Sequence, residues 1–282
     1  MAEILYVSSM IDWIGVQNGV RLINDDAESA LDKLDENSVD LVVTSPPYDA
    51  LRKYTEDGMW SEDKCRAIIS KLRRVVKDGG VVVWVVGDQT KNGSETGTSF
   101  KEALMFMEEG FNLNDTMIWE KKNPMPQVKQ KRYGQVFEYM FVFSKGQPKT
   151  FNPIMVPCKC AGQKYDSTCK NMGGENGRTK KSFNINEEKV KSNIWEIAIA
   201  QNKTGHPAVF PYELAYDHIR SWSNEGDVVL DPFMGSGTTG LAAKDLNRDF
   251  IGIEISENYW RMSLERIENN EKARIAYRAN TV

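Results

Sequence analysis

Residues 227–240, Asp-Val-Val-Leu-Asp-Pro-Phe-Met-Gly-Ser-Gly-Thr-Thr-Gly, decide the fold class. An apolar run ends at Asp231, a turn rich in glycine follows, and the stretch 241–246 has the composition of a helix. Glycines let the backbone pass close to a ligand at the carboxyl end of a strand, where open α/β sheets bind nucleotides. We therefore expect an α/β protein with a mostly parallel, doubly wound sheet and a nucleotide-like ligand at this turn.

The chemistry of this turn fits S-adenosylmethionine better than ATP. A phosphate-binding loop needs a Lys followed by Ser or Thr after its last glycine, whereas Gly237 is followed by Thr238 and Thr239. Asp231 would also repel a phosphate, but it would tolerate a ligand with a positive sulfonium. The next predicted strand, 250–255, places Glu254 near its end, where an acid accepts hydrogen bonds from ribose hydroxyls in nucleotide-binding units.

A second motif, Thr44-Ser45-Pro46-Pro47-Tyr48, follows the apolar run 39–43. Two consecutive prolines cannot continue a buried strand, so the chain must turn outward there. Taken alone, the prolines could simply end the strand. The Ser45 hydroxyl and the local carbonyls nevertheless remain as rigid acceptors, and the Tyr48 ring offers a stacking face. Acceptors beside an aromatic plane suit an amino-bearing base that has been flipped out of a nucleic-acid stack.

Together, TSPPY at 44–48 and DPFMGSGTTG at 231–240 resemble motifs IV and I of the amino-directed DNA methyltransferases. The catalytic motif precedes the cofactor motif, which resembles the permuted order of the β class. The segment 24–27 resembles the family segment upstream of the catalytic strand, and 205–211 resembles motif X. The resemblance implies the Rossmann-like fold of S-adenosylmethionine-dependent methyltransferases, with an antiparallel hairpin and a small target-recognition module.

The resemblance also assigns cofactor contacts to individual residues. Asp26 is the candidate contact to the adenine of the cofactor, and His206 lies in the motif X segment, against the methionine end. The set expected to bind S-adenosylmethionine is Asp26, Thr44, His206, Asp231, Pro232, Phe233, Gly235, Ser236, Gly237, Thr238 and Glu254. The product would be S-adenosylhomocysteine, and no metal is expected.

The expected catalytic residues are Ser45, Pro46, Pro47 and Tyr48. An aromatic amino group attacks poorly unless acceptors hold its hydrogens, which the Ser45 hydroxyl and the Pro46 carbonyl can do. Pro47 would fix the loop and Tyr48 would stack on the base. In the family, Ser at the first position of the tetrapeptide leans toward cytosine N4 and Asp toward adenine N6, and 51–54 resembles the N4-cytosine enzymes. We expect cytosine N4, with adenine N6 by the same mechanism as the alternative.

The charge distribution points to DNA as the partner. The chain has 282 residues and a net charge of -4, yet residues 121–191 hold fifteen Lys or Arg against five acids. A basic segment inside an acidic protein is typical of a surface that contacts the phosphate backbone, although it could also be a solvated charged loop. The individual DNA contacts expected are Lys129, Lys131, Arg132 and, beside the catalytic motif, Arg52.

Three parts are expected along the chain: 1–150 as the catalytic part, 151–195 as the target-recognition module and 196–282 as the cofactor-binding part. Between the motifs, apolar spacing predicts helices over 62–76 and 100–107 and strands over 81–86, 113–119 and 136–144. Gly79 and Gly80 are expected to end the first of these helices, and the last two strands to form the antiparallel hairpin.

Composition adds limits rather than a function. The apolar stretches are far shorter than the roughly 20 residues that cross a bilayer, and the first ten residues lack the pattern of a signal peptide. We expect a cytoplasmic protein of a prokaryote or a phage-infected cell. Four cysteines, at 65, 158, 160 and 169, do not suggest a disulfide framework and fit a zinc site poorly.

Other classes of function stay open at this point. One is methylation of an RNA or protein amide nitrogen, against which the permuted order and the basic segment argue. The other is a DNA-binding protein without catalysis, although both motifs look intact. The recognised DNA sequence, a cognate restriction endonuclease and the choice between monomer and homodimer are not settled by sequence.

Overall fold

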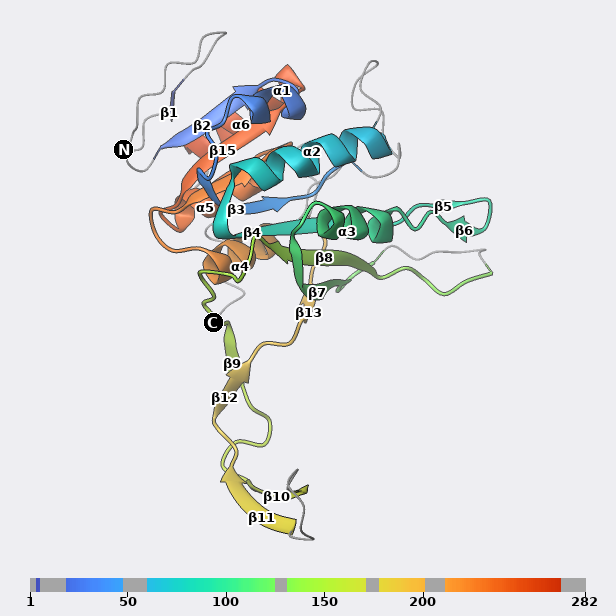
Figure 1. Cartoon of the computed structure of the whole chain (residues 1–282), viewed down its shortest axis with the longest axis vertical. Helices are drawn as coiled ribbons and strands as arrows, with labels where there is room; N and C mark the ends of the chain where they lie inside the picture. The colour runs from blue at the N-terminus through green and yellow to red at the C-terminus, as the bar shows by residue number, and fades with distance from the viewer. Residues whose placement is uncertain are drawn as a thin grey trace. The chain divides into compact units, whose positions relative to one another are not determined.

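The computed structural model describes residues 4–5, 19–47, 60–124, 131–170, 178–200 and 211–269. The chain divides into two compact units (Figure 1): the first contains the residues up to Asn152 and from Asn193 onward, and the second contains Pro153–Ser192. Within the described ranges, no helix is both long and apolar enough to cross a membrane.

The first unit is built on one twisted sheet whose described strands have the order β1-β2-β15-β14-β3-β4-β8-β7-β13. Every neighbouring pair is parallel except those that β8 makes with β4 and β7. The strands are β1 Ile4–Leu5, β2 Val20–Asn24, β3 Val39–Thr44, β4 Val76–Val86, β7 Asn112–Lys121, β8 Phe137–Ser144, β13 Ile194–Ile197, β14 Val228–Asp231 and β15 Asp249–Glu254. The predicted α/β sheet and its antiparallel hairpin are therefore confirmed.

Helices cover both faces of this sheet (Figure 1). Ile251 and Ile253 of β15 belong to the apolar core that α1, α2 and α3 share with the sheet. Phe250 points to the opposite face, where its ring lies beside Gly240 of α5, and Ile267 of α6 packs there too. The helices are α1 Ala27–Asp32, α2 Glu62–Val75, α3 Thr98–Glu108, α4 Tyr212–Trp222, α5 Thr238–Asp245 and α6 Glu257–Asn269. The alternation of side chains along each strand supplies both layers.

One element boundary differs from the sequence prediction. Helix α2 ends at Val75 and β4 begins at the next residue, so Gly79 and Gly80 lie inside β4 rather than ending the helix. The register between β3 and β4 shifts there, from Val39 paired with Val76 to Leu41 paired with Val81. Gly79 has a φ of 81°, which favours glycine, so the two glycines form an irregular step within the strand.

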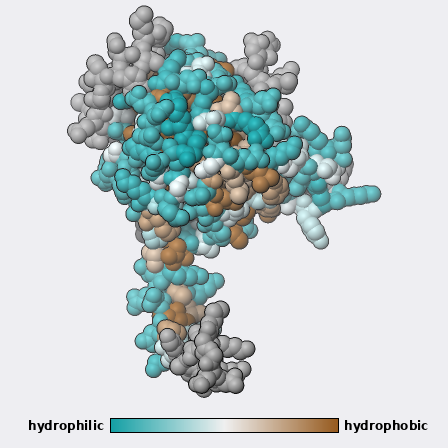
Figure 2. Space-filling model, in the orientation of Figure 1, coloured by the Kyte–Doolittle hydropathy of each residue, from teal (hydrophilic) through white to brown (hydrophobic). Residues whose placement is uncertain are grey.

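The second unit consists of two antiparallel strand pairs in its described part. Strand β9 Met155–Pro157 pairs with β12 Glu188–Val190, and β10 Lys164–Lys170 pairs with β11 Arg178–Asn184. Tyr165 lies directly opposite Phe183, and both side chains are exposed. Figure 2 shows hydrophobic residues at the surface of this unit among hydrophilic ones. A third, short hairpin, β5 Thr90–Lys91 with β6 Ser94–Glu95, belongs to the first unit.

Candidate active site

The candidate site lies where five parallel strands end. Strands β2, β15, β14, β3 and β4 run in the same direction, so their carboxyl ends meet at one edge of the sheet. That edge carries Asp26 after β2, Glu254 on β15, Asp231 on β14 and Ser45 after β3. Acidic groups and the two sequence motifs, which are far apart along the chain, are thus brought together. Ligands of open α/β sheets bind at this edge.

The glycine turn, Met234–Gly237, joins β14 to α5 in a conformation that needs glycine. Gly235 has a φ of 52° and Gly237 a φ of 80°, both in the left-handed region. The Gly235 amide donates to the Glu254 carboxylate at 2.9 Å, and the other oxygen of that carboxylate accepts from the Ser256 amide at 2.9 Å. Glu254 therefore fastens the turn to the end of β15.

Two further glycines let the turn and α5 lie close to their neighbours. A Cβ on Gly240 would stand 2.6 Å from both Phe250 and Ile267, and a Cβ on Gly252 would stand 2.3 Å from the sulfur of Met234. Such approaches leave no room for a side chain. Close packing of α5 on β15 and α6 thus requires glycine at 240, and close packing of Met234 on β15 requires glycine at 252.

Asp231 is buried and binds within the protein. Its side chain accepts hydrogen bonds from the hydroxyls of Thr44 and Thr239, each at 2.6 Å, and from the Phe233 amide at 3.1 Å. Burial raises the pKa of Asp231 to about 6, against the lowering effect of these hydrogen bonds. Burial also raises the pKa of Glu254, although the Ser256 and Gly235 amides oppose the shift.

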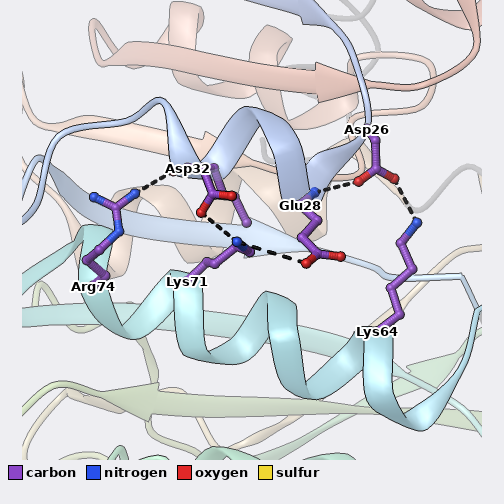
Figure 3. Close-up of polar contacts among 7 residues, drawn as sticks. Asp26, Glu28, Asp32, Lys64, Lys71 and Arg74 are labelled. Atoms are coloured by element: carbon purple, nitrogen blue, oxygen red, sulfur yellow. Dashed lines mark hydrogen bonds and ion pairs between the residues drawn. The ribbon is translucent and has the colours of Figure 1, made fainter.

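Asp26 occupies the start of α1 and contacts α2 (Figure 3). One carboxylate oxygen accepts from the Glu28 amide at 2.9 Å as the helix N-cap, and the other binds the Lys64 ammonium at 2.7 Å. Burial raises the pKa of Asp26, but the hydrogen bond and charge of Lys64 outweigh it, so the pKa lies below its usual value. Lys71 of α2 lies between Glu28 and Asp32, which extends these contacts along the two helices.

Known protein sequences match this chain over most of its length. A family model for DNA methylases of the N6/N4 type matches residues 39–265. The orphan methyltransferase M.BamHII of Bacillus amyloliquefaciens is 49% identical over 243 residues, which are 82% of this chain and 89% of that protein. This chain belongs to the N6/N4 DNA methylase family.

Solved structures agree with the assignment of this methylase. The structure of M1.HpyAVI in complex with S-adenosylmethionine has a TM-score of 0.57 and 25% sequence identity, and the match covers 88% of this chain and 99% of that one. The PvuII DNA methyltransferase, described as cytosine-N4-specific, has a TM-score of 0.65 at 21% identity, covering 91% and 89%. The latter likeness concerns the fold. The expected methyltransferase fold is confirmed.

The cofactor-binding and catalytic residues that were predicted from the sequence, and that the structure describes, lie at the carboxyl edge of the sheet. Thr44, Pro46, Pro232, Ser236 and Thr238 are buried beside the turn or at the end of β3, while Ser45 and Pro47 are partly exposed. The Ser236 carbonyl accepts a hydrogen bond from Arg266 of α6. Four predicted site residues lie outside the described residues: Tyr48, Arg52, Lys129 and His206.

The two described residues predicted to contact DNA differ in their surroundings. Lys131 is exposed. The Arg132 guanidinium binds the β5–β6 hairpin, donating to the Thr90 hydroxyl and to the Gly93 carbonyl and lying 3.6 Å from Glu95. Arg132 therefore connects its loop to that hairpin, and its charge is partly compensated by Glu95.

An aromatic support behind the glycine turn was missed by sequence reasoning. The rings of Trp60 and Trp84 both meet Phe233 edge-on, with centroids 5.3 Å and 6.2 Å away. Both indole nitrogens donate to the buried Glu102 carboxylate of α3, at 3.3 Å and 2.7 Å. The available signal was Glu102 itself, because it shares a helical face with the buried Ser99 and Phe106. A charged residue at such a position indicates a specific buried partner.

The buried carboxyl of Asp231 should leave a signature in the pH dependence of stability. Because its folded-state pKa of about 6 lies above the ordinary value of 3.8, the folded chain keeps a proton between about pH 4 and 6 that the unfolded chain has lost. Its contribution to stability is present below that window and is lost as the pH rises through it, by up to about 3 kcal/mol. As the pH rises through this window, the wild-type protein should therefore lose stability relative to the Asp231→Asn variant, which has no carboxyl group at this position.

Urea unfolding of both proteins from pH 4.5 to 7.5 measures the difference. Glu254, whose pKa is also raised, is present in both proteins, so its titration differs between them only by the part of its shift that the charge of Asp231 causes. Parallel pH curves for the two proteins would show that Asp231 titrates alike in the folded and unfolded chains.

Proposed function

We propose that this methylase transfers a methyl group from S-adenosylmethionine to the exocyclic N4 of a cytosine flipped out of double-stranded DNA. The observation that carries the base assignment is Ser45, which places a hydroxyl, not a carboxylate, directly after the buried strand β3. A neutral acceptor at this position is what the N4-cytosine resemblance implies. Methylation of adenine N6 by the same residues is the alternative.

The catalytic loop, Ser45–Pro47, would act by holding the amino group. The Ser45 hydroxyl and the Pro46 carbonyl each accept one of its N–H bonds, which localises the lone pair on nitrogen and aims it at the methyl donor. Neither proline has an amide hydrogen and each fixes its own φ, so the acceptors stay in place. Tyr48, outside the described residues, would stack on the flipped base, and unstacking the base costs a few kcal/mol.

The residues of the glycine turn fit S-adenosylmethionine. Among the described residues, the buried Thr238 hydroxyl has no hydrogen-bond partner, and α5 begins at this residue without a side-chain cap. Free N–H groups at a helix start and an unsatisfied hydroxyl suit the carboxylate end of a ligand. Each Glu254 oxygen accepts one backbone amide hydrogen bond and keeps a second lone pair, with which it would accept from a ribose hydroxyl. The cofactor, when bound, supplies a methyl group activated by a sulfonium.

The second unit is proposed as the target-recognition module. Pro153–Ser192 contains eight Lys or Arg and four acids within a chain whose net charge is -4. Positive charge supplies affinity for the phosphate backbone, and a two-stranded ribbon fits the major groove of DNA. Strands β10 and β11 form such a ribbon. The exposed Lys131 is proposed as a phosphate contact of the first unit.

The identity of the methylated base tests the proposal directly. The purified protein is incubated with unmethylated double-stranded DNA and S-adenosylmethionine, the DNA is digested to nucleosides, and the products are identified by mass spectrometry. We expect N4-methylcytosine, which should be absent when the cofactor is omitted. N6-methyladenine would overturn the base assignment and keep the mechanism. Cofactor binding without any methylated DNA base would contradict the DNA substrate and favour an RNA or protein amide.

A further inference from the structure

Side chains connect the TSPPY motif and the glycine turn at the point where the recorded backbone pairing of β3 with β14 ends. The pairing of β3 with β14 is recorded for Leu41 with Val229 and for Val42 with Leu230. Beyond it the chains diverge, β3 into the catalytic loop and β14 into the glycine turn. At that point the Thr44 hydroxyl donates to the Asp231 carboxylate at 2.6 Å. A hydrogen bond between side chains thus continues the connection that the pairing of β3 with β14 begins.

The same carboxylate also holds the helix that follows the glycine turn. The Asp231 oxygen that does not bind Thr44 accepts from the hydroxyl of Thr239, in the first turn of α5, at 2.6 Å. The Thr239 hydroxyl in turn lies 3.4 Å from the Val43 carbonyl of β3. Thr44, Asp231 and Thr239 are all buried, with at most 1% of each residue exposed. Both carboxylate oxygens are therefore used inside the protein.

Burying the Asp231 carboxylate costs free energy unless its hydrogen-bond donors stay in place. In the described part of the chain, no Lys or Arg forms an ion pair with Asp231, and its recorded partners are neutral hydroxyl and amide donors. Losing the Thr239 hydroxyl would leave one buried oxygen of Asp231 without its donor, and losing the Thr44 hydroxyl would leave the other oxygen with the Phe233 amide alone. The network is therefore satisfied only when the catalytic loop and the start of α5 keep one relative position.

We propose that Asp231 is a positioning residue, which holds the catalytic loop in register with the glycine turn through the hydroxyls of Thr44 and Thr239 and does not itself contact the cofactor. The link is a property of the fold, and only its effect on catalysis rests on the proposed function. Its consequence is that a change at Thr239, in α5, reaches Ser45 through Asp231.

The variants Thr44→Val and Thr239→Val test the link because Val keeps the shape of Thr and removes only the hydroxyl. Thr116→Val makes the same change in β7, three strands away from β3. Hydrogen–deuterium exchange is followed by mass spectrometry in the peptide that spans Leu41 to Ser45, without any ligand. We expect faster exchange of this peptide in both link variants, while peptides of β8 and the Thr116→Val protein exchange as in wild type.

Kinetics on DNA supply the second readout. Each link variant should lower kcat by about tenfold to a hundredfold, because a displacement on the order of 1 Å has such effects. The dissociation constant of S-adenosylmethionine should change by less than about threefold. The double variant Thr44→Val/Thr239→Val should be little slower than either single variant, because both changes break the same link.

Three results would overturn the proposal. Unchanged exchange of the 41–45 peptide in Thr239→Val would show that α5 does not communicate with the catalytic loop. A decrease in kcat of the double variant equal to the product of the two single decreases would show that the two hydroxyls act independently. Weaker cofactor binding with unchanged kcat would make this cluster a cofactor contact. If wild type methylates no DNA base, the proposed function fails, whereas the exchange experiment still decides the link.

Discussion

Replacing Ser45 with Ala is expected to lower kcat for DNA methylation by about a hundredfold or more. Ser45 lies between the buried Thr44 and the buried Pro46, so the backbone that carries its side chain is held in place. Loss of one preorganised hydrogen-bonding group from an active site costs about 10²–10³ in kcat. The variant should still bind S-adenosylmethionine, because the glycine turn is unchanged. Single-turnover kinetics and calorimetric titration with the cofactor measure the two quantities.

Ser94→Ala is the matched control for this experiment. Ser94 lies on β6, where its hydroxyl donates to the Glu95 carbonyl at 3.2 Å in an exposed setting, and no catalytic role is proposed for it. It should retain the kcat of wild type. A Ser45→Ala protein with nearly full kcat would contradict the role of this hydroxyl as an acceptor and leave the Pro46 carbonyl as the group that orients the amine.

Gly237→Ala is expected to lower the free energy of unfolding by about 2–5 kcal/mol and to weaken cofactor binding at least tenfold. Gly237 has a φ of 80°, and an added Cβ would lie 2.9 Å from the Cβ of Ser263. The left-handed conformation costs a non-glycine residue about 1–2 kcal/mol, and overpacking adds about 1–3 kcal/mol. The turn must shift to relieve the contact, and its amides shift with it. Urea unfolding and cofactor titration report both effects.

Gly93→Ala is the control that separates the cost of the left-handed backbone conformation from the cost of the added Cβ contact at Gly237. Gly93 has a φ of 82°, nearly that of Gly237, but an added Cβ would meet nothing within 4 Å. It should therefore show only the conformational cost, about 1–2 kcal/mol. The difference between the two variants measures the contact of the glycine turn with α6. Equal losses of stability in both proteins would show that this contact is relieved without cost.

Features encoded within a short stretch of sequence were predictable. The order of strand, glycine turn and helix at 227–246 is specified locally, because apolar runs and glycines constrain the backbone directly. The alternation of strands and helices predicted the parallel sheet, and the apolar runs before Ser45 and around Glu254 placed these two residues at strand ends. The glycines at 79 and 80 were misplaced, because a glycine pair also suits a step inside a strand when a neighbouring strand imposes it.

Features that depend on which elements pack together were not predictable. Nothing near Asp231 in the sequence identifies Thr44 as its partner, since 187 positions separate them. Likewise, Asp26 meets Lys64 only because α1 packs beside α2. Glu102 joins two tryptophans from different parts of the chain. These contacts refine the roles of residues whose general location the motifs had already indicated.

The permuted order of the strands also has a consequence for protein synthesis. Strand β3 lies in the middle of the sheet, yet its partner β14 follows at Val228 and β2 pairs with β15 at Phe250. At about 5–20 residues per second, the ribosome needs roughly 10–40 s to pass from Thr44 to Asp231. During that interval the nascent chain presents an apolar strand with one unpaired edge. Until residues 228–254 have emerged, neither β3 nor β2 can complete its pairing in the sheet, and an unpaired apolar strand edge is a site where chains aggregate.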